Sequence, residues 1–355
     1  GSKPDFSAAM VAFKRCADAY PNSSFAGESI KRVVDYFISI RDYNRAQETL
    51  DRVFQDYPDA PWLDEMLLKW GVVCHRLGNR AEAIAKFPAN LRDSETAKLD
   101  DARWCELLPG VEYFYGKFSK LYNKGMEDVS VIRVDYRKAK VRMEFVDNRA
   151  NGGGNRKTSD VAGRRKALFG VNCTFPMWYA KMDGKVVKDG HKEGGLALND
   201  DKTYEFFDAS WWKKHPNGEG WTDVFSTEAL GLLGGRQTLD GVSWGSAPYT
   251  FMGEATNNVL YVCVVDGRTP RSQGLGYGTV HTFLREFGCF NGMCIDGGGS
   301  TTMVIRKDLL PADVNELQHT SEGSPAHWTM NHTIDNLLGR ERKVCNQLLF
   351  VAARD

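Results

Sequence analysis

The sequence predicts an α+β protein of two domains: an N-terminal α-helical repeat domain over residues 1–125, and a mixed α/β domain over residues 126–355. The second domain is predicted to have a central sheet that contains a βαβ unit. Three observations support this class. A repeat with helical periodicity covers the first part of the chain, alternating strand-like patterns begin near residue 129, and a strand–helix–strand pattern ends at Asp296. A chain of 355 residues is long enough to bury two such cores.

The repeat has a period of 37 residues within residues 5–100. Small residues recur where helices would cross, and prolines follow alternate helices, which resembles tetratricopeptide helix pairs. About two and a half copies are predicted, followed by a capping helix over residues 101–118. Such a domain either docks a protein or peptide partner or serves as a spacer against the second domain. The matched positions are Phe6 with Tyr43, Ala9 with Ala46 and Ala83, and Tyr20-Pro21 with Tyr57-Pro58.

The second domain begins with alternating apolar and polar residues over 129–136 and 141–146, which predict two strands. A short helix is expected over residues 159–165, followed by a strand that leads into residues 171–175. The section 183–247 is rich in Gly, Trp and Asp, and short strands and long loops are expected there.

The predicted βαβ unit brings two carboxylates together. Val259–Val265 is an almost continuous apolar run typical of a buried strand, and an apolar stripe predicts a helix over residues 278–287. A second strand then leads to Asp296. Two strands joined in this way are expected to run parallel with a right-handed crossover, which places Asp266 and Asp296 at the same carboxyl edge of the sheet.

Asp296 is followed by three glycines and then by hydroxyl residues. Glycines allow positive φ angles and expose main-chain N–H groups, an arrangement that suits an anion such as phosphate. A plain Gly-rich turn is the alternative, but it would not require an acid beside three glycines. The predicted anion-binding residues of this loop are Gly297, Gly298, Gly299, Ser300 and Thr301.

Composition excludes some functions. The 46 basic and 46 acidic residues give no net charge, so nothing favours nucleic acid or an anionic membrane. No apolar run approaches the ~20 residues that span a bilayer. The start Gly1-Ser2 is typical of a cloning remnant, so the lack of a signal segment gives no information on location. Eight cysteines without a CxxC pair predict buried thiols rather than a zinc site.

These motifs together resemble the phosphodiester glycosidase family over roughly residues 128–352. The chain departs from that family where Tyr249-Thr250-Phe251 replaces the usual Arg-Thr-Ala, so a cation is missing. The resemblance implies hydrolysis of the glycosidic bond of a sugar-1-phosphodiester, in bacterial extracellular or cell-wall glycan metabolism, and an extracytoplasmic location. The matched segments are Asn172–Phe175, Pro248–Gly253, Val265–Arg268, Asp296–Ser300, Asn331 and Gly339–Val344.

Glycosidases generally use two carboxylates, one as acid or base and one as nucleophile or water activator. We predict Asp296 and Asp266 in these roles, with Glu254 in reserve, and their separate assignments as acid and base stay open. The glycine loop and Arg268 are assigned to the phosphate, and Asn172 and Asn331 to sugar hydroxyls. Arg342 is assigned to substrate binding, with an ordinary ion pair as its alternative. Arg236, Arg268, Arg340 and Arg342 are the cations available to replace the missing arginine.

No cofactor is predicted to be essential, although paired carboxylates with phosphate also suit Ca²⁺ or Mg²⁺. His319, His327 and His332 lie in a loop without ligand-like spacing. Two other classes of function compete with the enzyme. One is a non-catalytic module that binds glycan or phosphate, and the other is a scaffold that docks a partner on the helical repeats.

Overall fold

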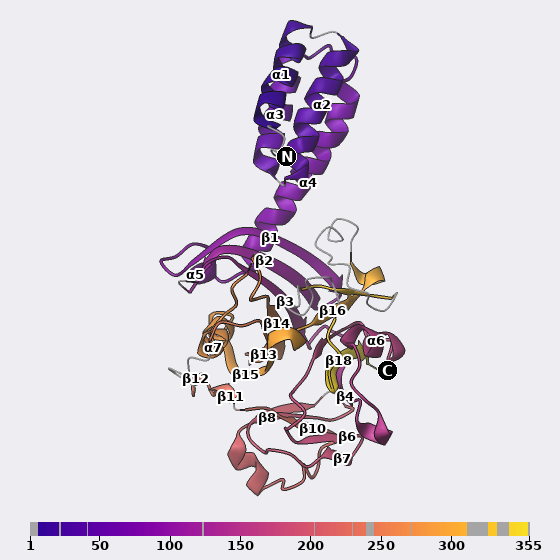
Figure 1. Ribbon diagram of the computed structural model, residues 1–355, viewed down its shortest axis with the longest axis vertical. Helices are drawn as coiled ribbons and strands as arrows, with labels where there is room; N and C mark the ends of the chain where they lie inside the picture. Colours follow the sequence, from indigo (N-terminus) through magenta and orange to yellow (C-terminus); the bar gives the residue numbers. More distant parts are fainter. Residues whose placement is uncertain are drawn as a thin grey trace. The chain divides into compact units, whose positions relative to one another are not determined.

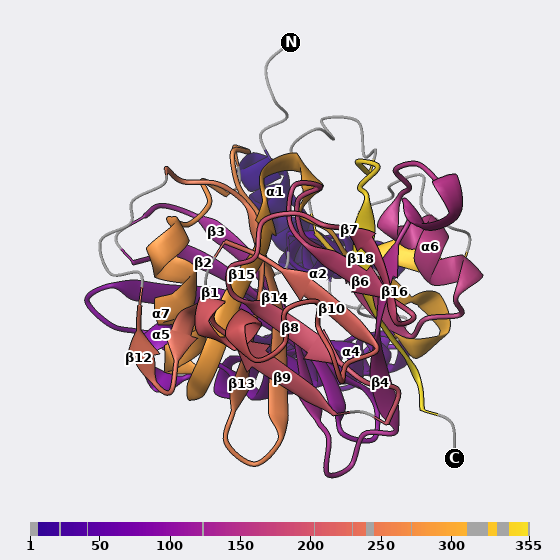
Figure 2. The same ribbon diagram turned by 90° about the horizontal axis from the view of Figure 1, so that it is seen from below.

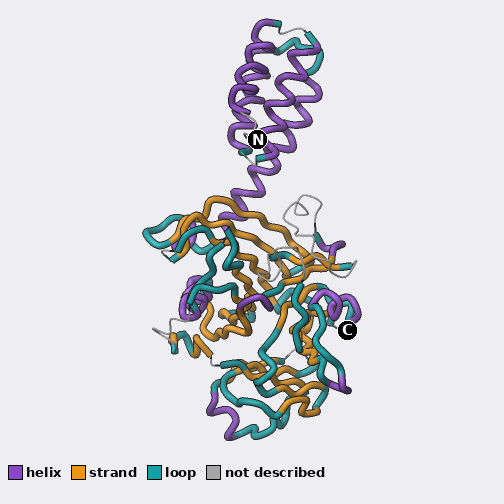
Figure 3. Tube along the Cα trace, viewed as in Figure 1, coloured by secondary structure: helices purple, strands orange, loops and turns teal. Residues whose placement is uncertain are grey.

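The computed structural model describes residues 6–20, 23–40, 42–122, 124–201, 203–228, 230–238, 245–270, 272–310, 326–331 and 341–353. Contacts divide the chain into two compact units, residues 1–82 and residues 83–355. Helices dominate the first unit and strands the second (Figure 3).

The first unit contains the helices labelled in Figure 1 as α1 to α4. Side-chain caps fix two of their starts, because Ser23 accepts a hydrogen bond from the Ala26 N–H at 3.2 Å, and Asp42 accepts one from the Arg45 N–H at 3.2 Å. Leu50 is fully buried in the core of this unit. The helices span Phe6–Ala19 (α1), Ser24–Ser39 (α2), Tyr43–Asp56 (α3) and Leu63–Lys86 (α4).

The predicted helical repeat domain over residues 1–125 is wrong. A third repeat would start a new helix near residue 80, but α4 runs through that position. The expected capping helix over residues 101–118 is instead a β-hairpin of β1 (Ala97–Leu108) and β2 (Val111–Leu121). Pro109-Gly110 forms the turn of this hairpin, and Gly110 has a φ of +79°.

The second unit is built from three sheets whose ladders, in the described residues, are all antiparallel. The largest has eight strands in the order β1-β2-β3-β14-β13-β15-β11-β12. Its remaining strands are β3 (Glu127–Asp135), β11 (Leu230–Leu233), β12 (Arg236–Gln237), β13 (Tyr249–Ala255), β14 (Val259–Val265) and β15 (Cys289–Gly297).

Two five-stranded sheets, ordered β17-β16-β5-β18-β4 and β7-β6-β10-β8-β9, complete this unit (Figures 1 and 2). The first consists of β4 (Val141–Asp147), β5 (Phe169–Asn172), β16 (Met303–Arg306), β17 (His327–Thr329) and β18 (Asn346–Ala352). The second consists of β6 (Ala180–Met182), β7 (Lys185–Lys188), β8 (Gly195–Leu198), β9 (Tyr204–Phe207) and β10 (Asp223–Ser226). The helices are α5 (Ala89–Arg92), α6 (Thr158–Arg164) and α7 (Tyr277–Glu286).

The predicted mixed α/β domain with a βαβ unit is also wrong. The strand Val259–Val265 and the helix after it are confirmed as β14 and α7, but β14 and β15 are not neighbours. β13 lies between them and pairs antiparallel with both. The carboxyl ends of β14 and β15 still meet at one edge, because both strands run opposite to the same strand. Tyr249 of β13 pairs with Val265 on one side and with Gly297 on the other.

The central core of the second unit is shared by all three sheets. Phe145 of β4 stacks on Phe225 of β10 with 5.0 Å between ring centroids, which joins the two smaller sheets. The opposite face of the large sheet is covered by α7, which packs beside β13 and β15 (Figure 1). The carboxyl edge of β15 therefore lies where the large sheet meets β5 and β16.

Candidate active site

A β-bulge in β15 aims the side chain of Asp296. Cys294 pairs with Phe251 and Asp296 pairs with Thr250, so Ile295 is an extra residue in the ladder. Strict alternation would turn Asp296 to the same face as Cys294. The bulge instead places Asp296 on the face of Thr250, and both side chains contact Asn172.

The Asp296 carboxylate is almost fully buried and accepts several hydrogen bonds. The Asn172 amide donates to Oδ2 at 3.0 Å, and the Gly297 N–H donates to Oδ1 at 2.7 Å. Ser300 supplies a further hydrogen bond, and the positive charge of Arg342 acts in the same direction. Burial nevertheless outweighs these contacts and raises the pKa of Asp296 from 3.8 to about 7. A carboxyl group with this pKa can hold and release a proton near neutral pH.

Asn172 is fully buried at the end of β5 and has a protein partner for each end of its amide. Its oxygen accepts from the Thr250 hydroxyl at 2.5 Å and from the Thr302 N–H at 2.9 Å, and its nitrogen donates to Asp296. In this arrangement Asn172 orients Asp296 rather than facing open space.

The glycine loop is part of the same network. A Cβ on Gly297 would lie 2.6 Å from Cε1 of Tyr249, so only glycine fits between this ring and the strand. Gly298 has a φ of +77°, and its N–H donates to the Pro248 carbonyl at 2.9 Å. The N–H groups of Gly297 and Gly298 are therefore already used within the protein. Gly299 and Ser300 follow in a buried single turn, Gly298–Ser300.

A pocket of about 410 Å³ opens beside Asp296. Its wall carries a second carboxylate, Glu228, and one cation, Arg268, whose side chain is exposed and whose φ is +56°. Burial raises the pKa of Glu228, and interaction with the Tyr277 phenol opposes that shift. The described residues that line it are Phe175, Met177, Trp178, Thr227, Glu228, Ala247, Tyr249, Arg268, Tyr277, Cys294, Ile295, Asp296, Gly297 and Gly298.

A sequence profile of the phosphodiester glycosidase family matches residues 139–351. The chain belongs to the phosphodiester glycosidase family. This family comprises hydrolases that act on phosphodiester-linked sugars. The matched region contains Asp296, Asn172 and the whole pocket, and it confirms the family indicated by the sequence motifs.

Two solved structures share the fold of this chain. One is the zebrafish N-acetylglucosamine-1-phosphodiester alpha-N-acetylglucosaminidase catalytic domain auto-inhibited by pro-peptide, at 18% identity and a TM-score of 0.50, over 70% of this chain and 87% of that one. The other, from Burkholderia pseudomallei K96243, is named "Putative exported protein". It has 12% identity and a TM-score of 0.51, over 70% of this chain and 96% of that one.

A curated relative is the SPbeta prophage-derived uncharacterized protein YomE of Bacillus subtilis (strain 168), 26% identical over 170 residues. The match covers 42% of this chain and 26% of that protein, so the chain spans about a quarter of the relative's length.

The other predicted catalytic carboxylates lie apart from the pocket. Asp266 follows β14 at the same sheet edge as Asp296, but the two strands are separated by β13, a spacing of about 10 Å. The Asp266 N–H donates to the Asp128 carbonyl at 2.9 Å, and Asp266 is not among the described residues that line the pocket. Glu254 lies four residues along β13 from Thr250, about 13 Å away, where it accepts from Asn291 at 3.2 Å.

The other residues predicted for the site lie in different places in the structure. Asn331 accepts from the Met303 N–H at 2.8 Å and donates to the Thr301 carbonyl at 3.0 Å, so it braces the strand after the glycine loop. Thr301 is fully buried. Arg342 is exposed and close enough to Asp296 to affect its pKa. Arg236 is exposed on β12, away from the residues that line the pocket, and Arg340, His319 and His332 lie outside the described residues.

Sequence reasoning missed Glu228 and the aromatic wall of the pocket. Glu228 lies within the section 183–247, for which the sequence indicated only short strands and loops. Its approach to β15 depends on contacts between strands far apart in the chain, and no local motif marks it. Tyr277 is the first residue of α7, and it is buried in the core beside Tyr249 while it also lines the pocket.

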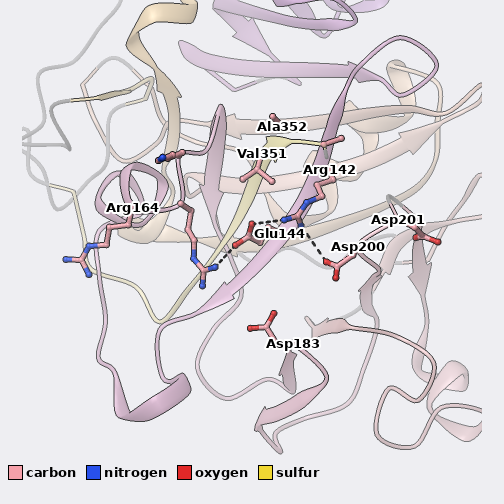
Figure 4. Close-up of a pocket in the computed structure, with 11 residues that line it drawn as sticks. Arg142, Glu144, Arg164, Asp183, Asp200, Asp201, Val351 and Ala352 are labelled. Carbon is pink, nitrogen blue, oxygen red and sulfur yellow. Dashed lines mark hydrogen bonds and ion pairs between the residues drawn. The ribbon is translucent and has the colours of Figure 1, made fainter. Parts of the chain in front are cut away.

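A larger cleft of about 690 Å³ lies at the far end of β18, near Val351, whereas Asn172 pairs with Gln347 near its start. Figure 4 shows Arg142 between Glu144 and Asp200, with N···O separations of 3.4 and 3.7 Å. Arg165 contacts Glu144 at 2.9 Å. These ion pairs neutralise the central side chains of the cleft, and we do not assign the reaction to it.

Two further findings concern the described part of the chain. No helix there is long and apolar enough to cross a membrane. Within the same residues, no three His, Cys, Asp or Glu side chains are grouped so that they could hold a metal ion. His327 is buried, and its Nε2 lies 2.8 Å from the Ala167 carbonyl oxygen.

Proposed function

We propose that the pocket beside Asp296 hydrolyses the glycosidic bond of a sugar-1-phosphodiester, with Asp296 as general acid. The observation that carries this proposal is a buried carboxyl at the pocket floor whose pKa is about 7. A general acid works best when its pKa lies near the operating pH, since it is then protonated and still able to give up its proton. Membership of the phosphodiester glycosidase family supports the same reaction.

The phosphate of the substrate is assigned to the side of the pocket that carries Arg268. Its exposed guanidinium is the cation on the described pocket wall, and arginine binds phosphate oxygens through paired N–H donors. Tyr249 lines the wall at the position where the family motif has arginine. Arg268 therefore takes over the charge that Tyr249 does not supply.

The sugar is assigned to the region between Asp296 and the aromatic wall. Tyr249 and Tyr277 form part of this wall, and aromatic rings with a polar tip offer both an apolar face and a hydrogen bond to a sugar ring. Phe175 and Met177, 40% and 52% exposed, stand at the pocket mouth, where the group beyond the phosphate would lie.

A bacterial, extracytoplasmic setting is part of the proposal. It is supported by a relative from a Bacillus subtilis prophage and by a Burkholderia pseudomallei structure whose name describes an exported protein. Glycan polymers of the bacterial surface that contain sugar-1-phosphodiester links are the substrate class this setting offers.

Release of free sugar from a panel of α-glycosyl-1-phosphodiesters tests the proposal, with wild type beside Asp296→Asn. The variant keeps the shape of the side chain but has no proton to give, so we expect turnover by wild type and a loss of about 10²–10⁴-fold in kcat/KM in the variant. Equal turnover by both proteins would refute the role of Asp296. Binding of these compounds without turnover by wild type would favour a non-catalytic binding module.

A further inference from the structure

We infer that Glu228 is the second carboxylate of this reaction, the group that accepts a proton from the attacking water. The inference rests on the proposed function and adds a residue that no sequence motif marks. The pocket that contains Asp296 has Glu228 on its wall, and these are the two carboxylates among its described lining residues. A glycosidase of this kind needs two.

The backbone before Glu228 is fixed against β15. The Thr227 N–H donates to the Gly194 carbonyl at 2.8 Å, and the Thr227 hydroxyl donates to the Cys294 carbonyl at 2.8 Å. Glu228 is the residue after Thr227, and Asp296 is two residues after Cys294. The hydrogen bond between Thr227 and Cys294 is therefore close in sequence to both carboxylates. The same anchor therefore brings both carboxylates into the wall of one pocket.

The β15 strand is open to the pocket at this point. β11 pairs with β15 only at Gly292 and Met293, so the following residues have no strand neighbour on that side within the described chain. Cys294, Ile295 and Asp296 line the pocket in consequence. Glu228 lies just before β11, which places it beside this open edge.

The two carboxyl groups differ in environment as an acid and a base should. Asp296 is deeply buried and has a pKa of about 7, whereas Glu228 is half-buried and touches the Tyr277 phenol. Burial raises the pKa of the Cys294 thiol, and the charges of Asp296 and Glu228 add to this shift, so both carboxylates lie near Cys294. A pKa of about 7 lets the more buried group, Asp296, carry a proton near neutral pH, and the less buried Glu228 is assigned as the acceptor.

Asp266 fits this role less well. Its main chain is tied to β3 through Asp128, and the hydroxyl of Ser272 donates to its carbonyl at 2.8 Å. Burial raises the pKa of Tyr113 and Tyr115 in β2, and the charge of Asp266 adds a smaller contribution. Asp266 is therefore near β2 and β3, and it is not among the described residues that line the pocket.

The step balances with these two groups. The oxygen of a water molecule forms a bond to the anomeric carbon while Glu228 takes one of its protons. The bond from that carbon to the phosphate oxygen breaks, and its electron pair stays on the oxygen. Asp296 delivers its proton to this leaving group, and exchange of protons with solvent restores both carboxyl groups.

The test compares Glu228→Ala and Glu228→Gln with wild type on the best phosphodiester of the panel. Glu219→Ala is the matched control, because Glu219 is an exposed glutamate of the same part of the chain and does not line the pocket. We expect kcat/KM to fall by about 10²–10⁴-fold in both Glu228 variants and to stay unchanged in the control. Formate, a small carboxylate that can occupy the space left by the side chain, is expected to restore part of the activity of Glu228→Ala.

Two further readouts separate a proton acceptor from a structural glutamate. Thermal melting and near-ultraviolet circular dichroism show whether the variants are folded. We expect the activity of wild type to fall at low pH as Glu228 takes up a proton, and the residual activity of Glu228→Gln to lack this fall. Activity of Glu228→Gln within threefold of wild type would overturn the inference. The inference would also fail if both variants lost activity, formate did not rescue Glu228→Ala, and the activity of Glu228→Gln still fell at low pH. Inactive Asp296→Asn beside active Glu228→Ala would reject only Glu228, whereas an inactive wild type would reject the proposed function and this inference together.

Discussion

Asp296 combines surroundings that pull its pKa in opposite directions. The N–H of Gly297, the amide of Asn172 and the hydroxyl of Ser300 all favour the ionised carboxylate. Burial favours the neutral acid and has the larger effect. The outcome is a group that is protonated over most of the acidic range and titrates near neutrality, a property that the residue type alone does not give.

The raised pKa of Asp296 makes the free energy of unfolding depend on pH. The pKa of Asp296 is raised in the folded state, so the folded protein holds a proton that the unfolded chain releases above pH 3.8. The stability contributed by the neutral form is therefore present below this pH and is lost as the pH rises to about 7. We expect Asp296→Asn, which cannot ionise, to melt at a higher temperature than wild type above pH 7.

Thermal melting between pH 4 and pH 9 measures this difference. The gap between variant and wild type should widen with pH up to about 7 and then level off, following the pKa of Asp296. Asp189→Asn, a change at an exposed aspartate, should show no such trend. A gap that is constant with pH would show that the Asp296 carboxyl is not neutral in the folded protein below pH 7.

At the scale of elements, the site depends on β13 and on the bulge of β15. Asn257 and Asn258 have φ angles of +63° and +59° and turn the chain from β13 into β14. Asparagine tolerates this region better than most residues, so an Asn-Asn pair between apolar runs is a hairpin signal. This signal predicts a hairpin of β13 and β14. It does not show which of these two strands pairs with β15.

The residue that follows α4, Phe87, is part of the core of the second unit. Phe87 is fully buried, and its ring lies 5.2 Å from Phe114 and 5.6 Å from Phe118 between centroids. Gly116 makes room for it, because a Cβ there would lie 2.5 Å from Cζ of Phe87.

We expect Phe87→Ala to lower the free energy of unfolding of the second unit by about 3–5 kcal/mol, since it removes a large buried side chain and leaves a cavity. Met126→Ala, at a side chain that is 47% exposed, should change it by less than about 0.5 kcal/mol. Denaturant unfolding followed by tryptophan fluorescence measures both. Equal effects of the two variants would show that Phe87 is not part of a packed core.

Elements with strong local patterns were predictable from sequence. The apolar run of β14 and the periodic stripe of α7 are confirmed, as are β4 and the short helix α6 within a few residues. The hairpin β1–β2 was not recognised, because Pro109-Gly110 reads equally well as a helix break. The pairing of β15 with β13 was not predictable either, since it is set by contacts across the sheet rather than by neighbours in the chain.

At the scale of the whole molecule, the described residues that line the pocket come from six separate stretches of chain. The loop after β5 gives Phe175, the loop before β11 gives Glu228, β13 gives Tyr249, β14 leads to Arg268, α7 gives Tyr277 and β15 gives Asp296. Motifs in four of these stretches indicated the family from sequence, and the family profile confirms it. Glu228 has no motif, and its nearness to Asp296 follows only once three antiparallel sheets bring β10, β11 and β15 together.

The central claim is that Asp296 acts as the proton donor. The pH dependence of kcat/KM for wild type on its best phosphodiester tests it most directly, because the diester itself does not titrate between pH 5 and pH 9. Since the acid must be protonated, the rate should fall about tenfold per pH unit above the pKa of Asp296, about 7. A rate that instead rises through pH 7 and stays high would mean that the ionised carboxylate is the active form, which would contradict this account.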